Sequence, residues 1–276
     1  MPNLLPQTLL VNMLALCSLS MQHAAAISTD SSVRINVAPG PVARGFLTPT
    51  GWGNQQPMAY AYLAGTFPQV YSQKSDLLSG IGAAWGDSCH AWSVRMALNV
   101  NDVSQFDQYS GNMALSFRLN AGSSITAGAL HLWANKINTD AGPSYYVALS
   151  RTVQKWRPRP DGTARAAYTV GAGTGRFYTM SQRDELSGRW KHGTIFFGSF
   201  TASISKTLVA TIEWTGHNLC FSTNWRPYLP ALFPFRLPSF SLGIADPLRT
   251  SGEHLRFVAS LSYGYALPWP KQRCNP

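Results

Sequence analysis

From residue 92 the chain alternates apolar side chains with small or polar ones, and this pattern constrains its fold more than any other feature. The apolar positions are Trp92, Val94, Met96, Leu98 and Val100, and the positions between them are Ser93, Arg95, Ala97 and Asn99. Successive side chains of a β-strand point to opposite faces, so the stretch predicts a strand with one apolar and one polar wall. The same alternation returns at 113–120, with Arg118 and Asn120 on the polar face.

Composition bears on which of these two walls faces outward. The chain is 45% hydrophobic and only 12% charged, about half the charged share of an ordinary soluble domain. A transmembrane barrel needs few charges, because it shows apolar side chains to lipid and keeps polar ones inside. The 9 Trp and 11 Tyr suit the aromatic girdles of such barrels. A soluble extracellular β-sandwich stays open as an alternative, with the opposite wall outward.

The chain is basic, with a formal net charge of +10. A basic balance can indicate nucleic acid, an anionic membrane surface or anionic solutes as partners. Here the basic residues are scattered, and the densest group, Lys155, Arg157 and Arg159, is interrupted by prolines. We therefore predict no nucleic-acid partner.

The first 26 residues have the pattern of a secretory signal peptide. An apolar run spans 9–19, and Ala24, Ala25 and Ala26 offer a cleavage site of small residues, although Lys and Arg are missing before the run. A membrane anchor is the alternative, but the run is shorter than the roughly 20 residues of a spanning helix. Residues 27–57, rich in Gly and Pro, are expected to form an N-terminal tail or plug.

Strand patterns then follow one another to residue 267, and residues 268–276 form a C-terminal tail. We predict an all-β fold, a single transmembrane antiparallel up-and-down β-barrel of about 12 strands, because the count is even and most segments approach the 9–11 residues of a membrane strand. The predicted strands are 58–67, 77–85, 91–100, 113–120, 125–135, 144–154, 164–174, 193–205, 208–215, 219–226, 238–245 and 256–267.

The predicted connections are tight at 86–88 and 206–207 and long at 101–112 and 175–192. Short turns on one side and long loops on the other are typical of outer-membrane barrels. The short connection at 217–218 and the long one at 227–237 break this regularity, so the strand count is open by two.

Cleavage after Ala26 would leave three cysteines, Cys89, Cys220 and Cys274, so at most one intrachain disulfide can form. The topology places Cys89 and Cys274 toward the same end of the barrel, which makes them the candidate pair, and three free thiols are the alternative. No spacing of Cys or His indicates a metal site, and no cofactor is predicted.

Several stretches resemble known families. Residues 262–267 (Ser-Tyr-Gly-Tyr-Ala-Leu) are similar to the terminal strand of bacterial outer-membrane barrels, which implies the barrel insertion machinery as a partner. The stretches 47–53, 80–82 with 85–87, 171–177 and 213–219, in that order, resemble a family of uncharacterised cyanobacterial outer-membrane proteins. The Glu-Trp-Thr-Gly of 213–216 is also similar to barrels linked to exopolysaccharide secretion. These resemblances imply a fold and a cell outer membrane location in contact with lipid, and they bring no settled activity.

With apolar faces outward, the predicted pore-lining residues are Arg95, Asn99, Arg118, Asn120, Glu213, Asn224, Arg226 and Arg256. Four arginines against one glutamate predict a positive lumen, and hence a passive porin-like channel for small, preferably anionic solutes. Glu213 is expected to be the internal partner of these arginines, because an isolated buried charge is costly. If such pairs fill the lumen, the protein is instead a non-conducting outer-membrane scaffold or exopolysaccharide-export component.

A third hypothesis, an outer-membrane lipid hydrolase, needs a Ser, a His and an Asn or Asp within hydrogen-bonding reach. His90 with Ser93 and His131 with Asn135 are possible fragments, but neither has its third member at a recognisable spacing. Gly86-Asp87-Ser88 is more simply a turn. We therefore predict that the protein is not an enzyme. Gly171, Gly173 and Gly175 share one strand face and are expected to make room for a bend or for the plug.

Overall fold

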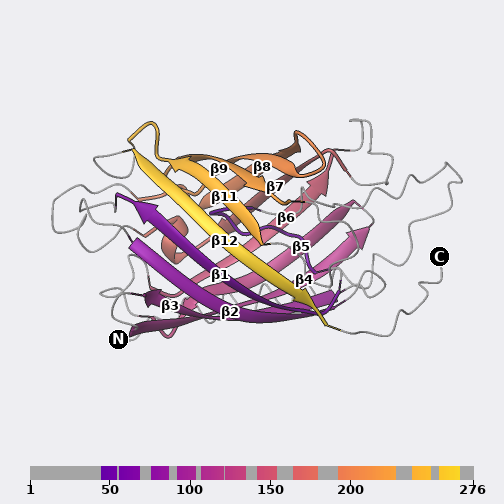
Figure 1. Ribbon diagram of the computed structural model, residues 1–276, viewed down its shortest axis with the longest axis horizontal. Coiled ribbons are helices and arrows are strands. Elements are labelled where there is room, and N and C mark those ends of the chain that lie inside the picture. Colours follow the sequence, from indigo (N-terminus) through magenta and orange to yellow (C-terminus); the bar gives the residue numbers. More distant parts are fainter. Residues whose placement is uncertain are drawn as a thin grey trace, which may run out of the picture. The chain divides into compact units, whose positions relative to one another are not determined.

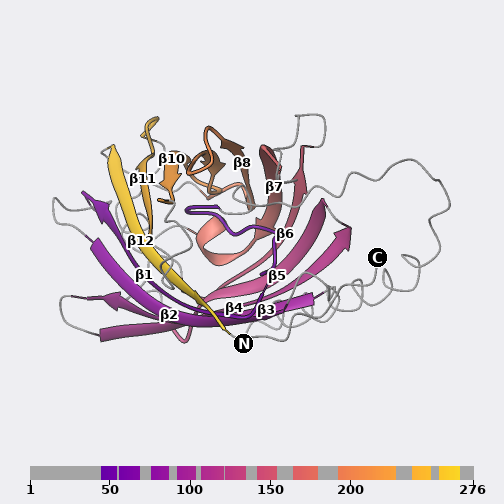
Figure 2. The same cartoon turned by 45° about the vertical axis from the view of Figure 1, so that its right-hand side comes forward.

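The chain folds as a closed barrel of twelve antiparallel strands (Figures 1 and 2). The computed structural model describes residues 45–54, 56–68, 76–86, 92–103, 107–120, 122–134, 142–153, 164–179, 192–227, 238–249 and 255–267. The strands are β1 (Met58–Phe67), β2 (Asp76–Gly86), β3 (Trp92–Asp102), β4 (Asp107–Asn120), β5 (Ser123–Leu132), β6 (Ser144–Thr152), β7 (Ala166–Gly173), β8 (Phe196–Ser203), β9 (Leu208–Trp214), β10 (Leu219–Trp225), β11 (Ser239–Ala245) and β12 (Arg256–Ala266). A short 3₁₀ helix, η3 (Gly175–Phe177), follows β7.

Each strand pairs with its neighbours in the chain, and the first strand closes the sheet onto the last. The β1–β12 ladder runs from Met58 opposite Ala266 to Phe67 opposite Phe257. Closure leaves no unpaired edge, so every strand can satisfy its backbone hydrogen bonds within the sheet. The prediction of an all-β antiparallel barrel with twelve strands is confirmed. Within the described ranges, no helix combines the length and hydropathy needed to cross a membrane.

One connection is much shorter than we expected. Residues 101–112 were predicted to form a long loop, but β3 continues to Asp102 and β4 begins at Asp107. Several polar residues of this stretch belong to the inner face of the ladder, among them Ser110: Asn99 lies opposite Ser110, and its Nδ2 donates to Ser110 Oγ at 3.0 Å. Their polarity reflects their position inside the barrel, and for that reason it was a misleading loop signal.

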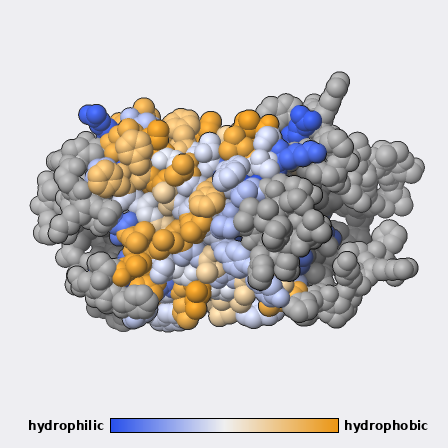
Figure 3. Space-filling view, viewed as in Figure 1, coloured by the Kyte–Doolittle hydropathy of each residue, from blue (hydrophilic) through white to orange (hydrophobic). Residues whose placement is uncertain are grey.

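The exposed fractions along β3 show which wall faces outward. Trp92, Met96 and Leu98 are 52%, 47% and 59% exposed, whereas Ala97 and Asn99 are 8% and 3% exposed. Apolar side chains therefore cover the outer wall, where Figure 3 shows them across the face formed by β12, β1 and β2. This orientation is the one expected of a barrel in lipid and the reverse of that in a soluble sandwich.

Exposed aromatic side chains lie near both ends of the barrel. We call the end where β1 begins and β12 ends the N/C end. The exposed aromatics near it include Trp85, Trp92, Trp225 and Tyr265. Those near the opposite end include Tyr109, Tyr145, Phe196 and Phe257. Two such belts are characteristic of barrels whose rims lie at the two membrane–water interfaces.

Candidate functional site

The inner wall of the barrel is built largely from small polar and small apolar side chains. The buried residues of this kind include Ser93, Ala97, Ser116, Thr126, Ala148, Ser150, Thr169, Thr201, Thr211, Ser222 and Ser241. Side chains of this size leave space around the barrel axis. The structure fills part of that space with two segments of its own chain.

The first is the plug segment, residues 45–54, which runs through the interior before β1 (Figure 2). The carboxylate of Glu213 on β9 is fully buried. It accepts backbone N–H groups of Phe46 at 2.8 Å, Leu47 at 2.8 Å and Thr48 at 3.2 Å, and the Thr48 hydroxyl at 2.8 Å. We expected an arginine partner for Glu213. Among the described residues, the donors are instead three peptide N–H groups and one hydroxyl of the plug segment, which satisfy the hydrogen-bonding capacity of the buried carboxylate.

The plug segment continues across the lumen from β9 to β6 and β3. The backbone N–H of Gly51 donates to Ser150 Oγ at 2.7 Å, and that of Asn54 donates to Ser93 Oγ at 3.1 Å. Trp52 is buried between these anchors and packs with Ala164 and Ala167. A Cβ at position 51 would lie 2.4 Å from the carbonyl oxygen of Ser124, so glycine is required where this segment approaches the wall.

The second inserted segment is η3 in the β7–β8 connection. Phe177 is fully buried, stacks on Phe197 with ring centroids 4.4 Å apart and meets Tyr146 edge-on. A Cβ at Gly171 would lie 2.2 Å from Phe197, and one at Gly173 would lie 2.5 Å from Phe177. The glycines of β7 thus make room, as expected, but for aromatic rings rather than for the plug segment.

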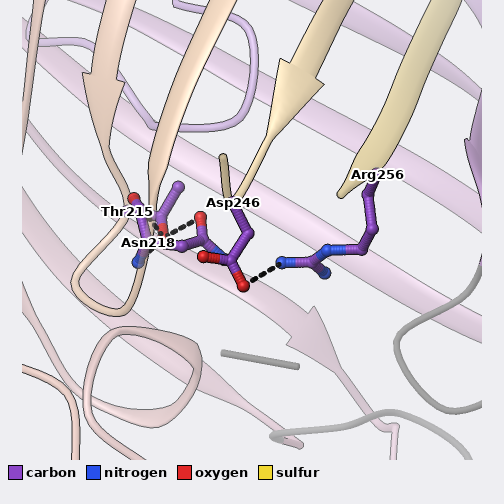
Figure 4. Close-up of polar contacts among 4 residues, drawn as sticks. All are labelled: Thr215, Asn218, Asp246 and Arg256. Atoms are coloured by element: carbon purple, nitrogen blue, oxygen red, sulfur yellow. Dashed lines mark hydrogen bonds and ion pairs between the residues drawn. The ribbon is translucent and has the colours of Figure 1, made fainter. Parts of the chain in front are cut away.

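An ion pair lies at the end of the barrel opposite the N/C end. Arg256 Nη2 is 4.0 Å from Oδ2 of Asp246, a carboxylate with no exposed surface. Figure 4 shows the guanidinium of Arg256 directed toward Asp246, beside Asn218, whose Oδ1 accepts the Thr215 hydroxyl at 2.9 Å. The charge of Arg256 is therefore engaged by a buried carboxylate at the ends of β11 and β12.

Two cavities occupy the part of the lumen that the inserted segments leave. The larger, about 450 Å³, is bordered by the plug segment, η3, β1–β5 and β9–β12. The smaller, about 200 Å³, lies against β1 and β3–β6 and contains Arg95. Tyr62, Asn112 and Leu130 line both, so the cavities adjoin. Together they extend from the ends of β3 and β5 toward the N/C end.

The sequence-predicted site residues fall into two groups. Asn99 is buried and hydrogen-bonded to Ser110. It lies on the inner side of the wall, as do Arg95, Glu213, Asn224 and Arg256. Arg95 lines the smaller cavity and Asn224 lines the larger one. The other three lie at strand ends: Arg118 and Asn120 are exposed at the end of β4, and Arg226 follows β10. That these residues line a conducting pore stays a prediction.

Sequence reasoning missed several residues that line the cavities. Tyr60 and Tyr62 face inward on β1, where the alternation of large with small residues is the reverse of that on β3. Arg176, which lines the larger cavity, lies in η3, and Asp246, which pairs with Arg256, follows β11. Leu63 and Phe67 share the other face of β1 and are exposed on the outer wall. Because both are apolar, their positions in the sequence could have shown that the two tyrosines face inward.

The fragments considered for a hydrolase stay untested, because one member of each lies outside the described residues. Ser93 faces the lumen, and its Oγ accepts the N–H of Asn54. His131 is a lining residue of the larger cavity. The partners in the hypothesis, His90 for Ser93 and Asn135 for His131, lie outside the described residues.

Cys220 is buried as a free thiol. Cys89 and Cys274, which form the candidate disulfide, lie outside the described residues, as do the signal-peptide residues 1–26 and the tail 268–276.

The fold and its interior define a class, a closed twelve-stranded β-barrel whose lumen is partly filled by its own chain. No protein-family model matches the chain, and no curated protein matches it significantly. Among solved structures, it is similar to the outer membrane phospholipase A of Escherichia coli, with 8% identity and a TM-score of 0.41, over 86% of this chain and 99% of that one. A comparison with the outer membrane protein OprG of Pseudomonas aeruginosa gives 8% identity and a TM-score of 0.18, over 79% and 100%.

Proposed function

We propose that this protein is an outer-membrane barrel that acts as a narrow passive channel favouring small anions, and not as an enzyme. The observation that carries the proposal is the adjoining pair of cavities beside the plug segment. They leave space along β1 and β3–β5, while the plug segment is bound on β9, β6 and β3. Solutes would pass through this remaining space.

The charges along this space support a preference for anions. The carboxylate of Glu213 is occupied by four hydrogen bonds from the plug segment, and Asp246 pairs with Arg256. The described lining of the smaller cavity includes Arg95 and no carboxylate. The larger cavity carries one of each sign, Asp76 and Arg176. Arg95 therefore gives the smaller cavity a positive charge. A fixed positive charge repels cations most strongly where a channel is narrow.

The surface supports a location in the outer membrane, with lipid around the wall and the barrel insertion machinery as a partner. Apolar side chains cover the outer wall, and aromatic ones lie near both ends. The proposed kinship with the cyanobacterial family rests on four stretches. Three of them meet in the lumen: 47–53 belongs to the plug segment, 171–177 ends at Phe177, and 213–219 begins at Glu213. The fourth, 80–82 with 85–87, lies in β2 up to Gly86, where that strand ends.

The test is the reversal potential of the folded protein in a planar bilayer under a chloride salt gradient. Concentrations between about 0.01 and 0.1 M keep the Debye length at about 30 to 10 Å, so that fixed charges act on permeating ions. Discrete anion-selective steps are expected, with selectivity lost in Arg95→Gln and inverted in Arg95→Glu. Arg151→Gln is the matched control and should retain the selectivity, because Arg151 is exposed on β6 between the buried Ser150 and Thr152 and so faces away from the lumen.

A second candidate, a non-conducting scaffold, is favoured by the four hydrogen bonds that bind the plug segment to Glu213. It predicts electrical silence from correctly inserted wild-type protein. Silence that persists after replacement of Glu213 would exclude the channel altogether.

A further inference from the structure

A cluster of polar side chains on β1, β3 and β4 borders the larger cavity. Tyr62 OH donates to Asn99 Oδ1, Asn99 Nδ2 donates to Ser110 Oγ at 3.0 Å, and Ser110 Oγ donates to Asn101 Oδ1 at 3.1 Å. Each group holds the next in a defined orientation. The cluster is therefore an ordered hydrogen-bonding surface at the mouth of the cavity.

Among the residues that the structure describes, two nitrogens of this region are buried without a hydrogen-bond partner. They are Nδ2 of Asn101 and Nδ1 of His131, and both residues line the larger cavity. The Asn101 side-chain oxygen accepts the hydrogen bond from Ser110, which fixes the orientation of the amide. The amide nitrogen is therefore available to donate to another group. Nearby, Asn112 Oδ1 accepts the backbone N–H of His131 at 2.9 Å. Buried polar atoms usually have partners, so those left over indicate where a polar molecule is bound.

The chemistry of the lining specifies the class of molecule. Amide and hydroxyl side chains, including those of Asn224, Ser222, Ser241 and Ser260, can both donate and accept, as can the hydroxyls of a sugar. Leu130 and the ring of Tyr62 offer apolar surfaces beside them, and Arg95 lies in the adjoining cavity. Guanidinium groups suit carboxylates. The volume of about 450 Å³ falls within the roughly 300–1,000 Å³ of small-molecule sites.

We propose that the two adjoining cavities bind a small hydroxylated carboxylate, a sugar acid of one or two rings. Its hydroxyls meet the amide and hydroxyl cluster around Asn101, and its carboxylate is directed toward Arg95. This inference deepens the proposed function, on which it rests, by naming the class of solute that the channel admits.

Binding can be measured without conduction, by calorimetric titration of the detergent-folded protein with glucuronate, glucose and acetate. Glucuronate is expected to bind at least about tenfold more tightly than either of the others, a difference of about 1.4 kcal/mol. Arg95→Gln removes the advantage over glucose, and Arg95→Lys keeps part of it. Asn101→Ala weakens the binding of glucuronate and of glucose alike, whereas Thr223→Ala, on the exposed outer face of β10, changes neither affinity.

The outcomes separate the two proposals. Anion-selective current from a protein that binds glucuronate no better than acetate overturns the sugar-acid inference and leaves the channel standing. Selective binding by an electrically silent protein supports the site and overturns the channel. Equal losses of affinity in Asn101→Ala and Thr223→Ala would also overturn the assignment, provided that both variants show the heat-dependent gel mobility of a folded barrel.

Discussion

Oε1 of Glu213 accepts two hydrogen bonds from Thr48, one from its backbone N–H at 3.2 Å and one from its hydroxyl at 2.8 Å. The two residues are 165 positions apart in the chain. Their contact joins the plug segment to the barrel wall at a carboxylate with no exposed surface. The Glu213 carboxylate, fixed in the sheet, determines where the N-terminal segment lies.

Replacing Glu213 by Gln should release the start of the plug segment. Hydrogen bonds to a charged group contribute about 1.5–3 kcal/mol each, and the freed donors regain water in the lumen. We therefore expect the free energy of unfolding to fall by about 2–4 kcal/mol, measured by urea titration in lipid vesicles. Thr48→Val, which removes only the hydroxyl bond, should cost about 1–2 kcal/mol. Equal stability of wild type and Glu213→Gln would contradict this role.

Phe177→Ala should destabilise the barrel more than any change on its outer rim. The ring is fully buried and stacked on Phe197, and truncation of a buried Phe costs about 3–5 kcal/mol. The exposed neighbour Tyr178 provides the control, because Tyr178→Ala should cost less than about 1 kcal/mol. Equilibrium unfolding followed by tryptophan fluorescence compares the two. Similar decreases in the free energy of unfolding of the two variants would show that η3 is not packed inside the lumen.

Gly51→Ala should displace the plug segment from the wall. The added Cβ would lie 2.4 Å from Ser124 O and 2.6 Å from Ser150 N, both backbone atoms that cannot move alone. Gly264→Ala is the matched control, because its Cβ would meet the mobile end of the Met58 side chain. The measurement is protease cleavage within residues 45–54 of vesicle-inserted protein, expected to rise only in Gly51→Ala. Protection of both variants would argue against the close approach.

Leu98→Arg tests the lipid-facing wall. Leu98 is exposed near the middle of β3, and an arginine facing lipid at mid-membrane costs about 2–4 kcal/mol. The same change at Ile204, which is exposed in the β8–β9 connection, should cost no more than about 1 kcal/mol. Folding yields and urea titrations in vesicles compare them. A tolerated Leu98→Arg would place this face in water.

The alternation of side chains was sufficient to predict the strands and their order. Each predicted strand overlaps one observed strand, because the apolar side chains of the outer wall recur at every second residue. The same rule failed where the inner wall is aromatic, as at Tyr60 and Tyr62. The lumen lacks the single apolar environment that makes the outer wall regular.

The contents of the lumen were harder to predict for a different reason. The plug segment is bound through backbone N–H groups, and every residue other than proline carries one. Sequence therefore predicts that Glu213 needs a buried partner but not which segment supplies it. The insertion of Phe177 had a visible signal in Gly171 and Gly173, which leave a gap on one strand face, but that signal does not name the ring that fills the gap.

The most direct test of the channel compares two neighbouring cysteine variants in a bilayer. Ala97 lines the smaller cavity and Leu98 faces outward. We predict that a charged, membrane-impermeant thiol reagent reduces the current of Ala97→Cys and leaves that of Leu98→Cys and of the wild type, with its own cysteines, unchanged. Loss of current in Leu98→Cys alone, or no current from any of the three inserted proteins, would contradict the account.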